Sequence, residues 1–390
     1  MAALLYRKQL LLAKVESSEG VAESPTGASN AILVENVRWT ETPNVIQTNE
    51  HLSTLDLGKP VIGGIRTSVS FSVWAQARSA GDTVPEIGPL LRACGFAETQ
   101  STATVPSGGA EALAAGGSTT TAVLGATATG TADLYNGMPI TFTSAVTGDS
   151  FIADYTSGKT ATLTDTMSGS LVATSNYIIP INVVYRPTSS SIPSLTMYLY
   201  RDGKLFKGLG ARGNFSMNWT AGGGIRFDFT FQAVWQAATD TSMATPTFQD
   251  GTKIIWRGES GSTSRMRWNR ILCAARSLTI DAGNSVVQPD DPEAIQGYDP
   301  ALITMREPSG SFDPLETLVA TRDIFSDMAA GTARILHARA GSSAGARIAV
   351  TSANTMATAN SQGDDRDGLS TEGVSFRCTG ANDGFSICFW

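Results

Sequence analysis

The sequence has few histidines and few cysteines. Of its 390 residues, two are histidine and four are cysteine. His51 and His337 lie in different halves, and neither stands near a Ser, Cys or carboxylate in a nucleophile arrangement, which argues against acid–base catalysis through histidine. The cysteines are Cys94, Cys273, Cys378 and Cys388. Because they show no paired spacing, they indicate neither a zinc site nor a disulfide framework, and we expect four buried core residues.

The chain also lacks long apolar runs and an excess of positive charge. No stretch approaches the roughly 20 apolar residues of a membrane helix. Arg7 and Lys8 lie within the first apolar run rather than before it, which is the wrong order for a signal peptide. The net charge is -7, whereas surfaces that bind nucleic acid or anionic membranes need clustered Lys and Arg. We expect no membrane association, and synthesis in a cytoplasm.

What the sequence does contain is strand-forming and turn-forming residues, with only 16% charged residues. This composition favours a mainly β protein whose surface is partly covered by partners. Residues 61–77 (VIGGIRTSVSFSVWAQA) alternate apolar and polar side chains, the pattern of a strand with one buried face. Residues 85–96 (PEIGPLLRACGF) then predict a short helix that ends at Gly95. One long amphipathic strand therefore leads into one short helix.

Composition and turn signals divide the chain into four parts. The length suits two or three domains. We predict two β-sandwich or barrel domains with one short helix each. A small all-β insert in the first of them is predicted from short strands broken by turn signals such as Asn136-Gly137, and residues 100–120 read as a flexible linker before it. The predicted parts are an arm at 1–30, a split first domain at 31–120 and 181–240, the insert at 121–180, and a second domain at 241–390.

The second half repeats the first in the order of its segments. Residues 276–287 (RSLTIDAGNSVV) parallel the early strand, and residues 301–314 (ALITMREPSGSFDP) parallel the strand at 61–77. Residues 321–331 (TRDIFSDMAAG) predict a second helix that ends at Gly331, with Ile324, Phe325 and Met328 on one face. We interpret this order as one β-rich, single-helix fold present twice; the alternative is a chance coincidence in a β-rich chain.

Two motifs resemble binding sites, but their context argues against that reading. Residues 208–213 (GLGARG) match G-x-G-x-x-G, yet they lead into an alternating segment rather than a helix, so we predict a hairpin instead of a dinucleotide site. The acidic clusters at 288–293 (QPDDPE) and 364–368 (DDRDG) lack the alternating oxygen ligands and distal Glu of a calcium loop. We predict solvated loops there, and neither a metal nor a cofactor.

One basic patch contains an aromatic residue. Arg265, Arg267 and Arg270 surround Trp268 in RMRWNR, an arrangement also found in phosphate or single-strand contacts. In an acidic chain we favour a strand whose arginines pair with a neighbour's carboxylates. Both readings, phosphate contact and intersubunit contact, remain candidates.

Three segments together resemble the tail tube (major tail) proteins of long-tailed bacteriophages. They are AKVESSEGVAESPTGASNAILVEN at 13–36, GPLLRACGFAET at 88–99 and YLYRDGKLFKGLGARGNFSMNWTAGGGIRFDFTF at 198–231. The resemblance covers both main domains, and the insert is similar to small β modules of tail proteins. It implies a structural virion protein of the tail, assembled in the host cytoplasm, and not an enzyme.

The resemblance also implies a mode of assembly. In such proteins strands of successive subunits join into a barrel that lines a channel, which removes free sheet edges, and rings stack into a tube. Six copies of the fold normally surround the channel, so two copies per chain imply a ring of three chains, with six chains as the alternative. The implied partners are the protein itself, the tape measure protein, the tail terminator and tail-tip proteins.

Long connections are the predicted ring-stacking elements, because a long loop in a compact domain is usually functional or bound to a neighbour. The candidates are Leu55, Asp56, Leu57 and Lys59 in the first connection, and Asp290, Asp291 and Glu293 in the second. The N-terminal arm is a third candidate, and the insert would project outward. DNA would pass through the channel without specific binding, because a neutral or acidic wall does not hold its phosphates.

Two other classes of protein fit parts of the sequence less well. A secreted or surface carbohydrate-binding, adhesin-like β protein fits the Thr and Gly content, but it should carry a signal peptide and a surface aromatic platform. A glycan-degrading enzyme requires paired carboxylates on neighbouring strands, and no spacing singles out such a pair.

Overall fold

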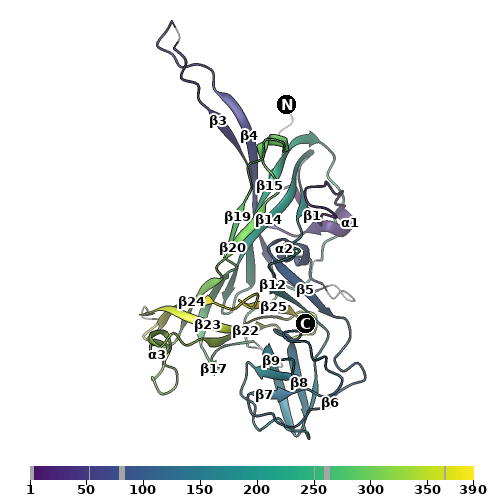
Figure 1. Ribbon diagram of the computed structural model, residues 1–390, viewed down its shortest axis with the longest axis vertical. Coiled ribbons are helices and arrows are strands. Elements are labelled where there is room, and N and C mark those ends of the chain that lie inside the picture. Colours follow the sequence, from purple (N-terminus) through teal and green to yellow (C-terminus); the bar gives the residue numbers. More distant parts are fainter. Residues whose placement is uncertain (1–3, 52, 79–83, 250, 259–263, 364–365) are drawn as a thin grey trace.

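The protein is mainly β, with a few short helices, as the sequence predicts (Figure 1). The computed structural model describes residues 4–51, 53–78, 84–249, 251–258, 264–363 and 366–390. The strands of this part form a 17-stranded sheet, a six-stranded sheet and a two-stranded hairpin.

Six strands of the first half are hydrogen-bonded side by side, each antiparallel to the next. Their order is β1 (Gln9–Val15), β13 (Leu195–Arg201), β14 (Lys204–Thr220), β15 (Ile225–Asp240), β4 (Val61–Trp74) and β3 (Glu35–Ile46). Helix α2 (Gly88–Ala93) follows β4 in the chain. A single helical turn, α1 (Gly27–Asn30), and the two-residue β2 (Ala31–Ile32) lie between β1 and β3.

The second half repeats this arrangement strand for strand, again with antiparallel pairs throughout. Its order is β16 (Arg265–Trp268), β22 (Arg334–Ala340), β23 (Ile348–Gln362), β24 (Glu372–Cys378), β21 (Ser309–Pro314) and β18 (Ala275–Asp281). Helix α3 (Ile324–Ala329) follows β21 as α2 follows β4. The repeat predicted from the order of segments is therefore present as a repeat of strand pairing.

The two copies share a local irregularity as well. In β3 the register shifts between Glu35 and Arg38. In β18 it shifts between Ala275 and Leu278. Both shifts lie in the first strand of the hairpin that precedes the helix, and β-bulges of this kind are features of a fold rather than accidents. The bulged residues lie opposite the buried Phe71 of β4 in the first half and opposite the half-buried Asp313 of β21 in the second, so the two bulges fall on different faces of the sheet.

The remaining strands connect the halves and build the insert. Those of the large sheet are β5 (Phe96–Ser101), β12 (Asn182–Pro187), β17 (Ile271–Leu272) and β25 (Ser386–Phe389). The two-stranded hairpin consists of β19 (Asn284–Val287) and β20 (Leu302–Arg306), with the 3-10 turn η1 (Ile295–Gly297) between them. The insert contains β6 (Glu111–Ala112), β7 (Thr121–Val123), β8 (Pro139–Ser144), β9 (Val146–Tyr155), β10 (Thr160–Leu163) and β11 (Asn176–Ile178).

Both halves contribute to one hydrophobic core. Phe71 of β4 stacks on Phe229 of β15, with ring centroids 5.5 Å apart, and Phe312 and Phe376 of the second half belong to the same cluster of buried residues. The alternation predicted for β4 is confirmed, since Val69, Phe71 and Val73 are buried. The helix predicted at 85–96 is confirmed too, and Gly95 ends it with a positive φ of 80°.

The structure corrects several predictions. β1 belongs to the sheet and its Leu11 is fully buried, so residues 9–15 are not an arm held from outside. Residues 100–120 are not a free linker, because Val105 pairs with Ile179 and Leu113 is buried in the insert. By contrast, the hairpin predicted at 208–213 is confirmed, since this segment lies inside β14, which forms antiparallel hairpins with β13 and with β15. On α3, Ile324 is buried but Phe325 is exposed.

Candidate assembly surfaces

The two halves are joined edge to edge by a strand ladder, which we call the internal junction. β14 of the first half pairs with β18 of the second from Ser216–Asp281 to Thr220–Ser277. Beside this ladder, the amide Nδ2 of Asn214 donates to Oδ1 of Asp281 over 2.8 Å. The internal junction is thus a backbone ladder supplemented by an amide–carboxylate hydrogen bond.

The hairpin β19–β20 completes the internal junction. Nδ2 of Asn284 donates to the carbonyl of Cys94 over 2.7 Å, and Nη2 of Arg306 donates to the carbonyl of Gly95 over 2.9 Å. Carbonyls at a helix C-terminus have no partner within the helix. The second half therefore supplies partners for the carbonyls at the end of α2 in the first half.

The internal junction joins an edge of β14 to an edge of β18. The corresponding strands of the other half are β23 and β3, and in the described part of the chain each of them has an edge without a neighbouring strand. Among the described residues, β3 pairs with β4 alone, so its other edge, the donor edge, is open. β23 pairs with β22 from Ile348 to Thr355 on one side and with β24 on the other, so Met356–Gln362 has no strand on the β22 side. We call this segment the acceptor edge. Open edges carry unpaired N–H and C=O groups and readily pair with another chain.

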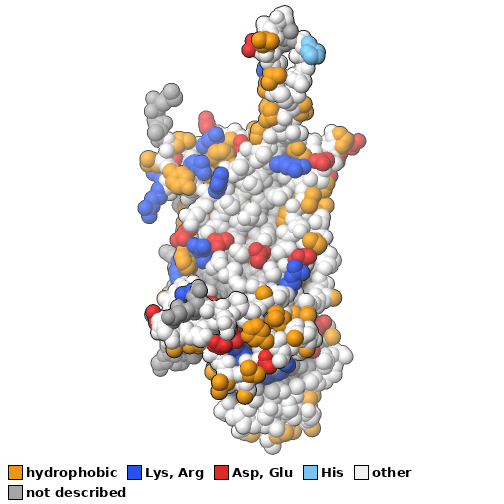
Figure 2. Space-filling model, turned by 90° about the vertical axis from the view of Figure 1, so that its left-hand side faces the viewer, with side chains coloured by type: hydrophobic (Ala, Val, Ile, Leu, Met, Phe, Trp, Pro, Cys, Tyr) orange, Lys and Arg blue, Asp and Glu red, His pale blue; other side chains and the backbone are white. Residues whose placement is uncertain are grey.

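The hairpin β3–β4 extends far beyond the body of the molecule as an arm (Figure 1). Figure 2 shows hydrophobic side chains on the arm. The exposed apolar residues of the arm are Val45, Ile46, Leu55, Leu57, Val61 and Ile62. A two-stranded hairpin is marginally stable by itself in water. An exposed apolar arm of this kind is suited to contact with another subunit.

The predicted stacking residues occupy two separate places. Leu55, Asp56, Leu57 and Lys59 are exposed near the tip of the arm, whereas Asp290 lies beside the body end of the arm, where its Oδ1 is 3.0 Å from Nη2 of Arg66. Asp291 and Glu293 form a tight turn, in which Oδ1 of Asp291 accepts a hydrogen bond from the Glu293 amide. The structure thus keeps Leu55 and Leu57 of the first connection apart from Asp290 of the second, although the body ends of the two connections meet where Gly64 lies against Gln296 and Tyr298.

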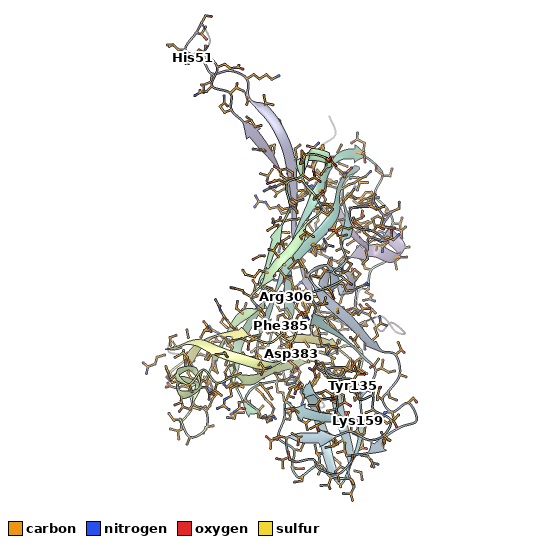
Figure 3. All side chains as sticks on the ribbon, in the orientation of Figure 1. His51, Tyr135, Lys159, Arg306, Asp383 and Phe385 are labelled. Atoms are coloured by element: carbon orange, nitrogen blue, oxygen red, sulfur yellow. The ribbon has the colours of Figure 1, made fainter. Side chains whose placement is uncertain are left out.

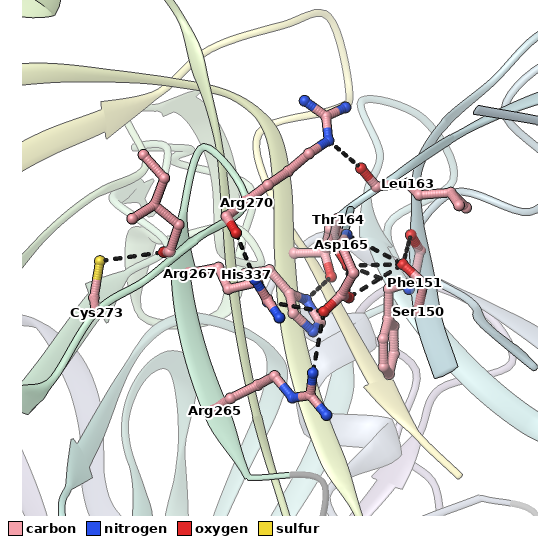
Figure 4. Close-up of polar contacts among 12 residues, drawn as sticks. Ser150, Phe151, Leu163, Thr164, Asp165, Arg265, Arg267, Arg270, Cys273 and His337 are labelled. Carbon is pink, nitrogen blue, oxygen red and sulfur yellow. Dashed lines mark hydrogen bonds and ion pairs between the residues drawn. The ribbon is translucent and has the colours of Figure 1, made fainter. Parts of the chain in front are cut away.

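The basic patch is engaged within the chain (Figure 4). The carboxylate of Asp165, in the insert, lies 2.8 Å from Nε of Arg267 and 3.3 Å from Nη1 of Arg265. Nε of Arg270 donates to the carbonyl of Leu163 over 3.0 Å. The carboxylate that pairs with Arg265 and Arg267 in the described residues therefore belongs to the insert of the same chain. We call this set of contacts the insert lock.

Buried charge surrounds the insert lock. Burial would raise the pKa of Asp165, but the guanidinium groups of Arg339 and Arg267 lower it below its usual value, so Asp165 is ionised. Burial lowers the pKa of Arg339 to about 10 and that of His337 to about 3. His337 is therefore neutral, and its Nδ1 lies 2.9 Å from the hydroxyl of Thr351.

A second polar contact of the insert involves Asp383, near the C-terminus (Figure 3). Burial, and then the charges of Asp133 and Asp154 in the insert, raise the pKa of Asp383 to about 6. Asp133 also accepts a hydrogen bond at its backbone carbonyl from Arg186. Acidic side chains from both sides of this contact thus lie close together.

The residue types that most often carry chemistry occupy unreactive places. Cys94, Cys273, Cys378 and Cys388 are free and buried, as predicted, and burial raises the pKa of each thiol. His51 lies exposed on the arm (Figure 3). Among the residues that the structure places, no three His, Cys, Asp or Glu side chains gather where a metal ion could bind. Asp364 and Asp365 lie outside the described residues.

Comparisons with protein-family models and with curated proteins assign no family to the chain. No protein-family model matches the chain, and no curated protein matches it. In the part of the chain that is described, no helix is long and apolar enough to cross a bilayer. Function must therefore be inferred from the geometry of the chain itself.

Proposed function

We propose that this protein is a structural subunit that assembles into stacked rings and so forms the tail tube of a bacteriophage, the conduit for DNA. One observation carries the proposal: the chain holds the same six-stranded, single-helix unit twice, joined edge to edge, and the edges that correspond to the joined ones are open. A chain with one donor edge and one acceptor edge is built to join copies of itself.

Head-to-tail contacts of this kind produce a closed ring when the rotation between subunits closes, and a helical filament when it does not. Closure into a ring pairs every sheet edge and removes the hazard that open edges present. If six units surround the channel, three chains complete the ring. A ring of six chains is the alternative, in which the second unit lies outside the first.

The charge of the chain suits a conduit rather than a DNA-binding protein. With a net charge of -7, a wall built from it would not retain phosphates as a basic surface does. Arg265 and Arg267 are paired with Asp165. DNA would pass without specific binding, and the tape measure, tail terminator and tail-tip proteins would be the other partners in the virion.

Electron microscopy of the purified protein tests this proposal. Rings or tubes with a central channel are the expected result. Monomers that remain dispersed at high concentration and that bind sugars on a glycan array would instead support the carbohydrate-binding, adhesin-like class.

A further inference from the structure

The two short helices α2 and α3 match in length and in the way they end. Each has six residues, and in each a glycine with positive φ stands two residues after the last helical residue: Gly95 at 80° and Gly331 at 62°. A glycine in this conformation commonly ends a helix. Counting back from the two glycines places Ala330 at the position of Cys94, without any use of strand registers.

The end of α2 is closed by the other half of the chain. Cys94 is fully buried. The carbonyls of Cys94 and Gly95 accept hydrogen bonds from the hairpin β19–β20, as described above. Ile303 of this hairpin lies beside Gly95, where a Cβ would stand 3.4 Å from Cδ1 of Ile303. The hairpin thus supplies both polar partners and an apolar cover to the end of α2.

The same end of α3 is open. Ala330 and Gly331 are exposed, and among the described residues neither carbonyl accepts a hydrogen bond. A Cβ at Gly331 would have one atom of the described chain within 4 Å, apart from its chain neighbours: Cε of Met356, in the same half. Carbonyls at a helix C-terminus have no partner within the helix. The end of α3 therefore lacks the cover that the end of α2 has.

The acceptor edge beside α3 carries a second unpartnered group. Asn360 is in register with the buried Val374, so its side chain faces the core side of the sheet. Its Nδ2 and Oδ1 are both buried, and neither has a hydrogen-bond partner among the described residues. Native structures rarely leave a buried amide unsatisfied without a reason. The acceptor edge and the end of α3 are thus both incomplete in the isolated chain.

The arm is the counterpart of the hairpin that closes α2. β18 and β21 continue into β19 and β20, and the strands that hold their places in the first half, β3 and β4, continue into the arm. We call residues 43–46 and 61–65 the arm base. In it Val45 lies opposite Ile62, and Ile46 lies opposite Val61. All four side chains are exposed, so each face of the arm base offers an apolar pair.

We propose that the arm base of one copy covers the end of α3 in the next copy, as β19–β20 covers the end of α2 within the chain. The proposal rests on the proposed ring and names the surfaces that close it. The contact would lie beside the pairing of the donor edge with the acceptor edge. The tip of the arm, with Leu55 and Leu57, would remain available for stacking.

Cross-linking in assembled protein tests the contact. Ala330→Cys is combined in turn with a cysteine at each of the four apolar positions of the arm base, and rings are first verified by electron microscopy. A short bis-maleimide is then added. Because the four native thiols are buried, only the introduced cysteines should react. The control combines Ala330→Cys with Leu55→Cys, which places one thiol at the tip of the arm.

We expect covalent oligomers up to a complete ring from the two positions on one face of the arm base, and monomers on denaturing gels from the control pair. Rings in which none of the four pairs is cross-linked, or in which the control pair is cross-linked instead, overturn the contact and leave the ring proposal standing. Absence of rings in unmodified protein overturns both.

A pair of double variants separates ring closure from ring stacking. Val45→Asp with Ile46→Asp puts a carboxylate on each face of the arm base, and it should lower the yield of rings roughly tenfold or more, because burying an unpaired charge is costly. Leu55→Asp with Leu57→Asp is the matched control at the tip, and it should leave single rings intact in sedimentation velocity. All four side chains are exposed in the isolated chain, so urea midpoints should stay at the wild-type value. An unchanged ring yield in the arm-base variant would contradict the contact.

Discussion

Replacing Asp165 by Asn should loosen the insert from the body, because the substitution removes the only negative charge of the insert lock that is drawn in Figure 4. The Asp165 side chain is 4% exposed and that of Arg267 is 15% exposed, so both charges are desolvated. Arg339 is fully buried nearby. Arg265 is 33% exposed, and water would compensate for most of its loss.

The expected cost follows from the cations left behind. Breaking a buried ion pair by removing one partner typically costs about 3–5 kcal/mol, since the remaining charge is buried without compensation. At about 1.4 kcal/mol per factor of ten, the equilibrium constant for opening the insert should rise roughly 100- to 4,000-fold. The global unfolding of the large sheet should change less, because the Phe71–Phe229 core is untouched.

Hydrogen exchange followed by mass spectrometry measures this opening locally. Peptides from β9 and β10 of the insert, and from β16 and β22 of the body, should exchange faster in Asp165→Asn by roughly the factor given above. Asp240→Asn is the matched control, because Asp240 is exposed at the end of β15, and it should leave these peptides unchanged. Exchange in Asp165→Asn within about threefold of wild type would refute the electrostatic account of the lock.

Two further predictions concern the pH dependence and the open edge. The pKa of Asp383 is raised to about 6 in the folded state, against about 3.9 in the unfolded chain, so protonation of Asp383 stabilises the fold. This contribution to the free energy of unfolding is complete below about pH 3.9 and is lost as the pH rises through 6. Urea midpoints should therefore rise from pH 7 to pH 5, and Asp383→Asn should reduce that rise; an equal rise in both proteins would contradict this. Ala359 is exposed on the acceptor edge and Ala126 is exposed in the insert. Ala359→Lys should lower the ring yield, since a lysine blocks an edge, whereas Ala126→Lys should not; sedimentation velocity compares the two, and equal yields would count against the acceptor edge.

The parts of the fold that could be predicted are those whose cause is local. β4 was predictable because it buries one face, which imposes alternation on its side chains. α2 was predictable because Gly95 ends it and its apolar residues share one side. β1 was not, because Leu10 and Leu11 belong to different buried clusters; a strand that buries both faces loses the alternation that would identify it.

The assembly surfaces depend on contacts between residues that are distant in the sequence. Arg267 suggested a phosphate or a neighbour because its partner, Asp165, lies in the insert, and no spacing connects the two. The exposure of the tip of the arm was predictable, because the connection between the two strands is long and carries Leu55 and Leu57 beside charged residues. Asn360 carried no signal at all, since an unsatisfied amide on an open edge becomes visible only when the strands are paired.

The central claim is that each chain supplies two of the units that surround one channel. Native mass spectrometry of rings dissociated from tubes measures the number of chains directly. The claim predicts a ring of three chains, close to three times the chain mass of 40.9 kDa. A ring of six chains would contradict it and would place the second unit outside the channel wall.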